Sequence, residues 1–472
     1  MAAKNLTIAK NWRGIAFDRQ ILVEFATCVC KPLVIIAILY SSGFVLARRL
    51  RKLYGVYRFP ASCIAFQQIV FTRSLHLISH MKSKFSIRSL RSRVLQTAAT
   101  GFASVATLYL TGNLVAQSFL IGGYGDGIYS SSLDSTGKMS EPKLAVKQRN
   151  PSFFAFHPKL DVLYSISESP RTDAGSPAAI AAYSFDRAQA ASGGSLSLKL
   201  LNLQKIDGDG PCHVVVDAKG EFLAVANYGS GSAVLLPIDE RGALKPASSV
   251  VQHSGKSADP KRQDKAHAHC SFWDPTNRYL FVSDLGLDKI FVYDFDRSLG
   301  GLKPAKHPSF SLAPGSGPRH LAIHQNGRWV YIINELNMTL TAAAWDATEG
   351  KLTEIHTVST LPVDAEGDNF STAEVLVHPS GRFVYGSNRG HHTIASFRVD
   401  PSTGKLTPIG HTPTGGKTPR NFRITPKGDF LLAENQQSDS VHSFRIDEST
   451  GELKPTGFSI AAPAPACIKF LE

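Results

Sequence analysis

Histidine, arginine and glutamate side chains recur at one position relative to a repeated turn in this chain. Imidazole groups can transfer a proton near neutral pH, and guanidinium groups match the geometry of carboxylate and phosphate. Such side chains are uncommon in an apolar core, so their concentration at one register predicts a polar site for an anionic small molecule. These residues stand four or five positions before the His, Asp or Thr that opens each turn. They are His213, His269, Arg319, His320 and Arg420.

A second polar set follows the next strand of each repeat. It includes Glu335 and Arg389, each directly after an asparagine. If these loops end at the same place, three arginines surround one carboxylate beside one or more histidines, which suits a multiply anionic ligand. Successive residues of a strand point to opposite faces. We therefore expect that the residues five and four positions before the turns do not all point into the channel. A hydrogen bond that ties neighbouring repeats together is the alternative role for any single residue, such as His213 or His320.

Metal and cofactor motifs near these residues are weak. His267 and His269 stand two apart, so on a strand they would share a face. No third ligand stands at the same register, and we therefore expect no metal site. The glycine-rich segment 122–127 is a tight turn with no helix after it, unlike a nucleotide-binding loop. We expect no cofactor.

The elements that position these residues form a repeat of about 50 residues. One phrase, a turn followed by a short apolar strand, occurs six times at intervals of 47 to 60 residues, and a second phrase, a strand that ends in Asp, occurs seven times. Several strands in each of seven units predict a seven-bladed β-propeller. The turns open at His157, Asp217, Asp274, His324, His378 and Thr425, and the strands end at Asp134, Asp186, Asp239, Asp296, Asp346, Asp400 and Asp447.

The two ends of the repeat region complement one another. Residues 119–134 lack a preceding partner strand, and residues 465–470 resemble an opening strand with nothing after it. Joined, they complete one unit, as in a ring whose terminal strands share a blade. We therefore predict an all-β domain over residues 117–472, preceded by a basic and partly apolar extension over residues 1–116.

The net charge of +13 belongs to that extension. Residues 1–116 hold 16 Lys and Arg and two acidic residues, whereas residues 117–472 hold 35 basic and 36 acidic residues. The predicted propeller is thus nearly neutral, and we expect no nucleic-acid partner.

The extension has the composition of a targeting or anchoring segment. Residues 25–47 are uncharged apart from Lys31 and precede four basic residues, so they are a candidate membrane contact. Residues 81–93 are rich in Arg and Ser and free of acid, as in organelle transit peptides, and Met81 is an alternative start. We expect an organelle-targeted or membrane-anchored protein, with a cytoplasmic protein carrying an inert disordered extension as the alternative.

Seven motifs along residues 118–470 resemble the seven-bladed β-propeller lactonase family, which includes 6-phosphogluconolactonases and 3-carboxy-cis,cis-muconate lactonizing enzymes. They are Gly-Pro-Cys-His (210–213), Ala-Asn-Tyr-Gly-Ser-Gly-Ser (226–232), His-Ala-His (267–269), Pro-Gly-Ser-Gly-Pro-Arg-His (314–320), Asn-Glu-Leu (334–336), Ser-Asn-Arg-Gly-His (387–391) and Thr-Gly-Gly-Lys-Thr-Pro-Arg (414–420). The resemblance implies a lactone site without metal at the channel mouth. It places the family's acid/base histidine on His269, its carboxylate on Glu335, and its anion-binding arginines on Arg319 and Arg389.

Three functions are consistent with these residues. The resemblance favours hydrolysis of a sugar-acid lactone, 6-phosphogluconolactone above all, with His269 or Glu335 as the base and the arginines holding the anionic groups. Carboxymuconate cyclisation, or a propeller that binds without catalysis, are the alternatives. The expected partner is a small anionic lactone, with His213, His267, His320 and Arg420 as further binding residues, and we expect a monomer.

Overall fold

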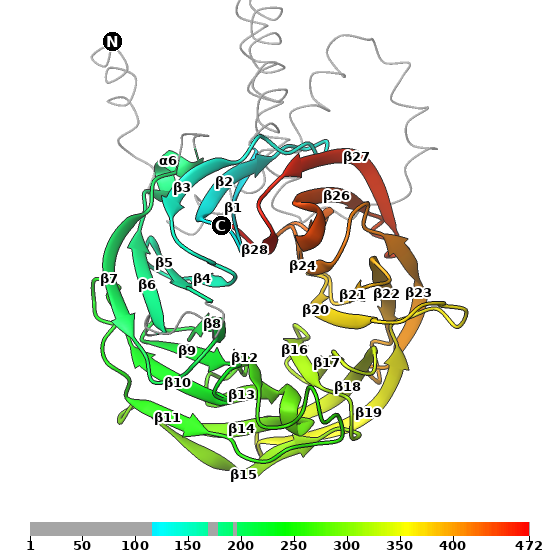
Figure 1. Cartoon of the computed structure of the whole chain (residues 1–472). Coiled ribbons are helices and arrows are strands. Elements are labelled where there is room, and N and C mark those ends of the chain that lie inside the picture. The colour runs from blue at the N-terminus through cyan, green and yellow to red at the C-terminus, as the bar shows by residue number, and fades with distance from the viewer. Residues whose placement is uncertain (1–115, 169–177, 192–195, 472) are drawn as a thin grey trace, which may run out of the picture. The chain divides into compact units, whose positions relative to one another are not determined.

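The computed structural model describes residues 116–168, 178–191 and 196–471, and over these ranges the chain forms seven four-stranded antiparallel sheets around a central channel (Figure 1). This confirms the predicted all-β seven-bladed propeller. The first strand of each sheet lines the channel, and the other three follow outward.

Each sheet has one inner strand, two middle strands and one outer strand. From the channel outward, the first three sheets are β28 (Pro465–Phe470), β1 (Gln117–Gly123), β2 (Gly127–Leu133) and β3 (Lys143–Lys147); β4 (Phe154–Phe156), β5 (Val162–Ile166), β6 (Ala179–Ser184) and β7 (Lys199–Lys205); and β8 (Pro211–Val216), β9 (Phe222–Asn227), β10 (Ser232–Pro237) and β11 (Ser249–Gln252). The next two are β12 (Ala268–Trp273), β13 (Tyr279–Asp284), β14 (Lys289–Asp296) and β15 (Gly301–Ser311); and β16 (Pro318–Ile323), β17 (Trp329–Asn334), β18 (Thr339–Asp346) and β19 (Lys351–Ser359). The last two are β20 (Ser371–Val377), β21 (Phe383–Arg389), β22 (Thr393–Val399) and β23 (Leu406–Pro413); and β24 (Pro419–Ile424), β25 (Phe430–Asn435), β26 (Ser440–Ile446) and β27 (Leu453–Ala461). Short helices are α6 (Arg187–Ala191), η2 (Leu285–Leu287) and η3 (Gln436–Ser438).

The two chain ends share one sheet, as the sequence predicts. Strand β28 pairs antiparallel with β1, so that Phe119 lies opposite Phe470 and Ile121 lies opposite Ile468. In Figure 1 the red C-terminal strand adjoins the cyan N-terminal strands of the same sheet. This pairing closes the ring.

The core lies between neighbouring sheets. All six residues of β9 and all six of β13 are buried. Both faces of these strands are covered, so their first four residues are all apolar and do not alternate with polar ones. One buried cluster joins Phe222 and Leu235 of one sheet to Trp273 and Phe295 of the next. Each sheet is thus stabilised by both neighbours.

The recurring turn holds several neighbouring sheets together. The Nε2–H groups of His157 and His378 donate to the carbonyl oxygens of Gly220 and Gly428, at 2.9 and 2.8 Å. Those glycines have positive φ angles of 78° and 79°, which residues with a Cβ rarely adopt. The repeated turn therefore reflects how the sheets are held together, and not the chemistry of the site.

The predicted extension, including the candidate membrane contact at residues 25–47 and the transit-like segment 81–93, lies outside the described residues. Among the residues that the structure describes, no helix has the length and apolar character needed to cross a membrane.

Candidate functional site

The inner strands begin with a β-bulge, and this irregularity builds the site. In β16, Pro318 pairs with Asn334 and His320 pairs with Ile333, which leaves Arg319 as the extra residue. A bulge interrupts the alternation of faces, so Arg319 and His320 both line the channel mouth. Other residues of the two registers, such as His213 and Cys270, do not, in agreement with the expectation that not all of them point inward. The same shift makes an extra residue of Cys212, His269, Arg420 and Ala466 in β8, β12, β24 and β28.

A narrow inner cavity results at the end of the channel where these strands begin. Two pairs of sequence neighbours line this cavity, Arg319 with His320 and Arg420 with Asn421. Because the lining comes from several sheets, equivalent repeat positions converge there. The remaining lining residues are Tyr124, Ser152, Phe153, Glu168, Cys212, His269 and Ala466.

An outer cavity of about 510 Å³ shares Tyr124, Glu168 and Arg420 with the inner one. His267 lies in this outer cavity, where its ring stacks on Tyr228 with centroids 4.4 Å apart. The outer cavity could hold a small polar molecule, whereas the inner cavity, at about 10 Å³, has room for a single small group of it. The other residues of the outer wall are Asp209, Gly210, Gly229, Lys265 and Gln436.

Glu335 lies at the centre of a buried cluster of arginines. Its carboxylate is within 2.5 Å of Arg262, 2.8 Å of Arg389 and 3.2 Å of Arg319. Burial alone would raise the pKa of Glu335, but the three guanidinium groups together lower it to about 2. The carboxylate is therefore ionised at neutral pH and already neutralised by its neighbours.

Backbone carbonyl groups fix two of these arginines further. Arg319 donates from Nη1 to the carbonyl oxygen of Ala373 at 2.7 Å, and Arg389 donates from Nη2 to that of Thr372 at 2.7 Å. Glu335 itself is held through its backbone, whose N–H donates to the carbonyl oxygen of Gly317 at 2.7 Å. The cluster is thus organised before any ligand binds.

Arg420 occupies the opposite side of the site. Its guanidinium lies over the ring of Tyr124, 5.0 Å from the centroid, and Tyr124 donates its hydroxyl to Glu168 at 2.9 Å. Burial raises the pKa of Tyr124, so the hydroxyl stays protonated. Burial alone would lower the pKa of Arg420, but Glu168 and Glu335 lie close enough to raise it, so its guanidinium group stays charged beside both cavities.

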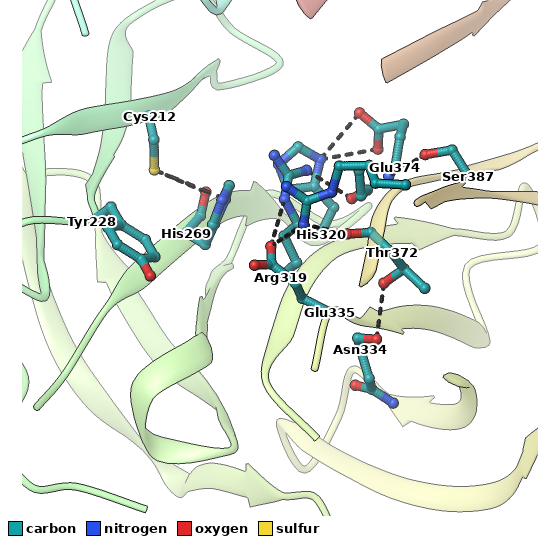
Figure 2. A network of polar contacts seen from close by, with 12 residues as sticks. Cys212, Tyr228, His269, Arg319, His320, Asn334, Glu335, Thr372, Glu374 and Ser387 are labelled. Carbon is teal, nitrogen blue, oxygen red and sulfur yellow. Dashed lines mark hydrogen bonds and ion pairs between the residues drawn. The ribbon is translucent and has the colours of Figure 1, made fainter. Parts of the chain in front are cut away.

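Three histidine rings lie close together in the channel. The ring centroid of His320 is 5.2 Å from that of His269 and 5.3 Å from that of His213. Burial holds the pKa of His269 and of His213 well below the ordinary value. Both rings are neutral at neutral pH. Figure 2 shows His269 next to the group formed by Arg319, His320 and Glu335.

The eight residues singled out from the sequence therefore fall into four places. The inner cavity is lined by His269, Arg319, His320 and Arg420. Glu335 adjoins it through an ion pair with Arg319, and Arg389 pairs in turn with Glu335. His267 lies in the outer cavity, and His213 packs behind the inner one against Phe153, at 4.2 Å. All eight lie at this end of the channel.

Several members of the site could not be recognised from the sequence. Arg262 and Lys265 lie in the connection between β11 and β12, and Tyr124 lies in the turn after β1, where the sequence indicates only a tight turn. None of them stands at a repeated position. Within the described ranges, no three His, Cys, Asp or Glu side chains gather in a way that could hold a metal ion.

Comparison with known proteins shows the family of the chain. Residues 118–470 match the family described as "Lactonase, 7-bladed beta-propeller". A 6-phosphogluconolactonase of Bacillus subtilis is 37% identical over 351 residues, which is 74% of this chain and 96% of that protein. A 6-phosphogluconolactonase of Formosa agariphila is 37% identical over 58% of this chain and 75% of its own length. The structure of a periplasmic gluconolactonase of Pseudomonas aeruginosa superposes with a TM-score of 0.70 at 28% identity, covering 76% of this chain and 99% of that one.

The chain belongs to the seven-bladed β-propeller lactonase family.

Proposed function

We propose that this protein hydrolyses a sugar-acid lactone, 6-phosphogluconolactone, to 6-phosphogluconate at the mouth of the propeller channel. The observation that carries the proposal is the inner cavity, where the neutral imidazole rings of His269 and His320 lie beside the guanidinium groups of Arg319 and Arg420. The names of the Bacillus and Formosa relatives support the substrate class.

Substrate binding divides between the two cavities. The lactone carbonyl enters the inner cavity, where Arg319 stabilises the oxyanion that forms when the carbonyl is attacked. The phosphate remains near the outer cavity, within reach of Arg420 and Lys265. Lys265 already donates to the carbonyl oxygen of Gly229 at 2.5 Å, which directs its ammonium group along the cavity wall.

The proton of the attacking water passes to an imidazole of the inner cavity, which contains His269 and His320. Glu335, the other candidate base, is poorly suited to that role. With a pKa of about 2 it has little affinity for a proton. We assign Glu335 to holding Arg319 and Arg389 in place.

The experiment measures hydrolysis of freshly generated 6-phosphogluconolactone by the purified protein against the spontaneous rate. Unphosphorylated gluconolactone and 3-carboxymuconate serve as competing substrates. Acceleration that is greatest for the phosphorylated lactone supports the proposal. Acceleration of gluconolactone alone would move the substrate to unphosphorylated lactones, and no acceleration of either lactone would overturn lactone hydrolysis.

A further inference from the structure

A buried carboxylate holds His320 in one orientation. The Nδ1 atom of His320 lies 3.0 and 3.1 Å from the two carboxylate oxygens of Glu374 (Figure 2). Glu374 is fixed in turn, because one of its oxygens accepts the N–H of Val375 at 2.9 Å and its own N–H donates to Ser387 Oγ at 3.0 Å. The pair joins β16 to β20 across the channel wall.

This contact sets the tautomer of His320. A carboxylate accepts, so Nδ1 must carry the proton and Nε2 must present its lone pair. Nε2 is buried, and no group among the described residues hydrogen-bonds to it. His320 lines the inner cavity. It thus has an unsatisfied acceptor at the place where the lactone is expected to bind.

The charged groups around His269 differ from those around His320, and this difference decides which ring is suited to act as a base. A base becomes a cation when it takes a proton, and a neighbouring anion stabilises that cation. Glu374 supplies such an anion to His320. The charged groups that act on His269 are the guanidinium groups of Arg319 and Arg420, which oppose its protonation.

The groups that face His320 come from five other strands and from its own. Burial lowers the pKa of His320, Glu374 raises it, and Arg319 and Arg420 lower it. The ring therefore remains neutral at neutral pH. The facing groups are His213 from β8, His269 from β12, Arg319 from β16, Glu374 from β20, Arg420 from β24 and, beyond the ring of Phe153, Lys469 from β28.

We infer that His320, oriented by Glu374, is the general base of the reaction. The inference rests on the proposed lactone hydrolysis. It replaces the expectation from the sequence, which gave the role of base to His269 or Glu335 and a binding role to His320.

The reaction then proceeds in two steps. His320 Nε2 takes a proton from water while the water oxygen bonds to the carbonyl carbon, and the carbonyl oxygen becomes an oxyanion beside Arg319. When the oxyanion collapses, the bond between the carbonyl carbon and the ring oxygen breaks, and the ring oxygen takes the proton back from His320. The product is a hydroxy acid whose carboxyl group releases a proton to solvent.

The test compares Glu374→Gln with wild type across the pH range on the full chain. The base must be neutral, so kcat/KM falls as the pH drops through the pKa of His320. Removing the carboxylate lowers that pKa, because Glu374 raises it. We expect the acidic limb of the Glu374→Gln profile to move to lower pH, with kcat lowered about 10- to 1000-fold.

Two further variants make the result specific. His320→Gln should lower kcat by about 100- to 10,000-fold and remove the acidic limb, while 6-phosphogluconate still binds. Glu349→Gln changes a glutamate that pairs with Lys306 and lines neither cavity, and it should leave the profile unchanged. Circular dichroism on each variant establishes that it is folded.

The outcomes separate this inference from the proposed function. If wild type hydrolyses lactone and the acidic limb of folded Glu374→Gln does not move, the inference is overturned and the proposed function stands. If His269→Gln removes the acidic limb and His320→Gln keeps it, His269 is the base. If wild type hydrolyses no lactone, both fail.

Discussion

Arg319 and His320 are adjacent in the sequence, yet both side chains line the same narrow cavity, because Arg319 is the extra residue of a β-bulge at the start of β16. In a regular strand the two would face opposite sides of the sheet. The bulge therefore doubles the number of side chains that one inner strand supplies to the channel mouth. This lets a cluster of cations and a histidine with its carboxylate partner lie side by side.

Replacing Arg420 should reduce activity toward the phosphorylated lactone selectively. Arg420 lines both cavities, so its loss removes a cation that can contact the ligand, together with its stacking on Tyr124 and its attraction to Glu168. For Arg420→Gln we expect kcat/KM on 6-phosphogluconolactone to fall at least about 100-fold, and on gluconolactone about 10-fold or less. Steady-state kinetics on both substrates measure the ratio.

Arg423→Gln is the matched control, because Arg423 lies on the same strand and outside both cavities. It should change either value less than about threefold. An equal loss on both substrates in Arg420→Gln would assign Arg420 to the carbonyl oxygen instead of the phosphate.

Neutralising Glu335 should destabilise the whole domain. Glu335→Gln leaves three guanidinium groups around an uncharged amide in a buried cluster, and removing one partner of a buried ion pair costs about 3–5 kcal/mol. Urea denaturation followed by intrinsic fluorescence measures the change. The double variant Glu335→Gln/Arg389→Met removes one of the excess positive charges, so it should regain part of the lost stability while staying inactive.

An unfolding free energy within about 1 kcal/mol of wild type for Glu335→Gln would show that the arginines do not depend on this carboxylate. Arg262→Gln provides a graded comparison. Its side chain is 41% exposed, so its loss should cost less than that of Arg389.

The ring closure and the location of the site could be predicted from the sequence, for a physical reason. Hairpin turns are encoded locally, and repeated turns place equivalent residues at equivalent points around a ring, so register alone points to His269 and Arg319. The bulges could not be predicted, because they depend on how β-strands pair. Arg262 comes from an irregular connection, and Glu374, although at the same register as His320, gave no sign that the two side chains would meet.

Acid should weaken the domain through Glu335. Its pKa is about 2 in the folded protein and near the ordinary 4.5 in the unfolded chain. A lowered folded-state pKa gives stability that is present above the ordinary value and is lost as the pH falls from about 4.5 toward 2. The difference corresponds to about 3 kcal/mol.

Unfolding free energies of wild type and Glu335→Gln at pH 7 and pH 3 test this linkage. The gap between the two proteins should be large at pH 7 and smaller at pH 3. At pH 3 the unfolded wild-type chain has taken up the proton, whereas the folded carboxyl group, with a pKa of about 2, is still largely ionised. A gap that is equal at both values would mean that the Glu335 carboxyl group titrates normally in the folded state.

Weakening the shared blade should destabilise the propeller as a unit. Phe470 is buried on β28, and its ring lies 5.4 Å from that of Phe119 on β1, so this contact joins residues from opposite ends of the chain. Phe470→Ala leaves a cavity at the seam, and we expect it to lower the unfolding free energy by about 3–5 kcal/mol. Phe458→Ala changes a phenylalanine on the neighbouring sheet that is 37% exposed, and should cost less than about 1 kcal/mol. Urea denaturation followed by both fluorescence and circular dichroism should give one coincident transition for Phe470→Ala, shifted to lower urea. Two separate transitions would instead show that the seam can open while the remaining blades stay folded.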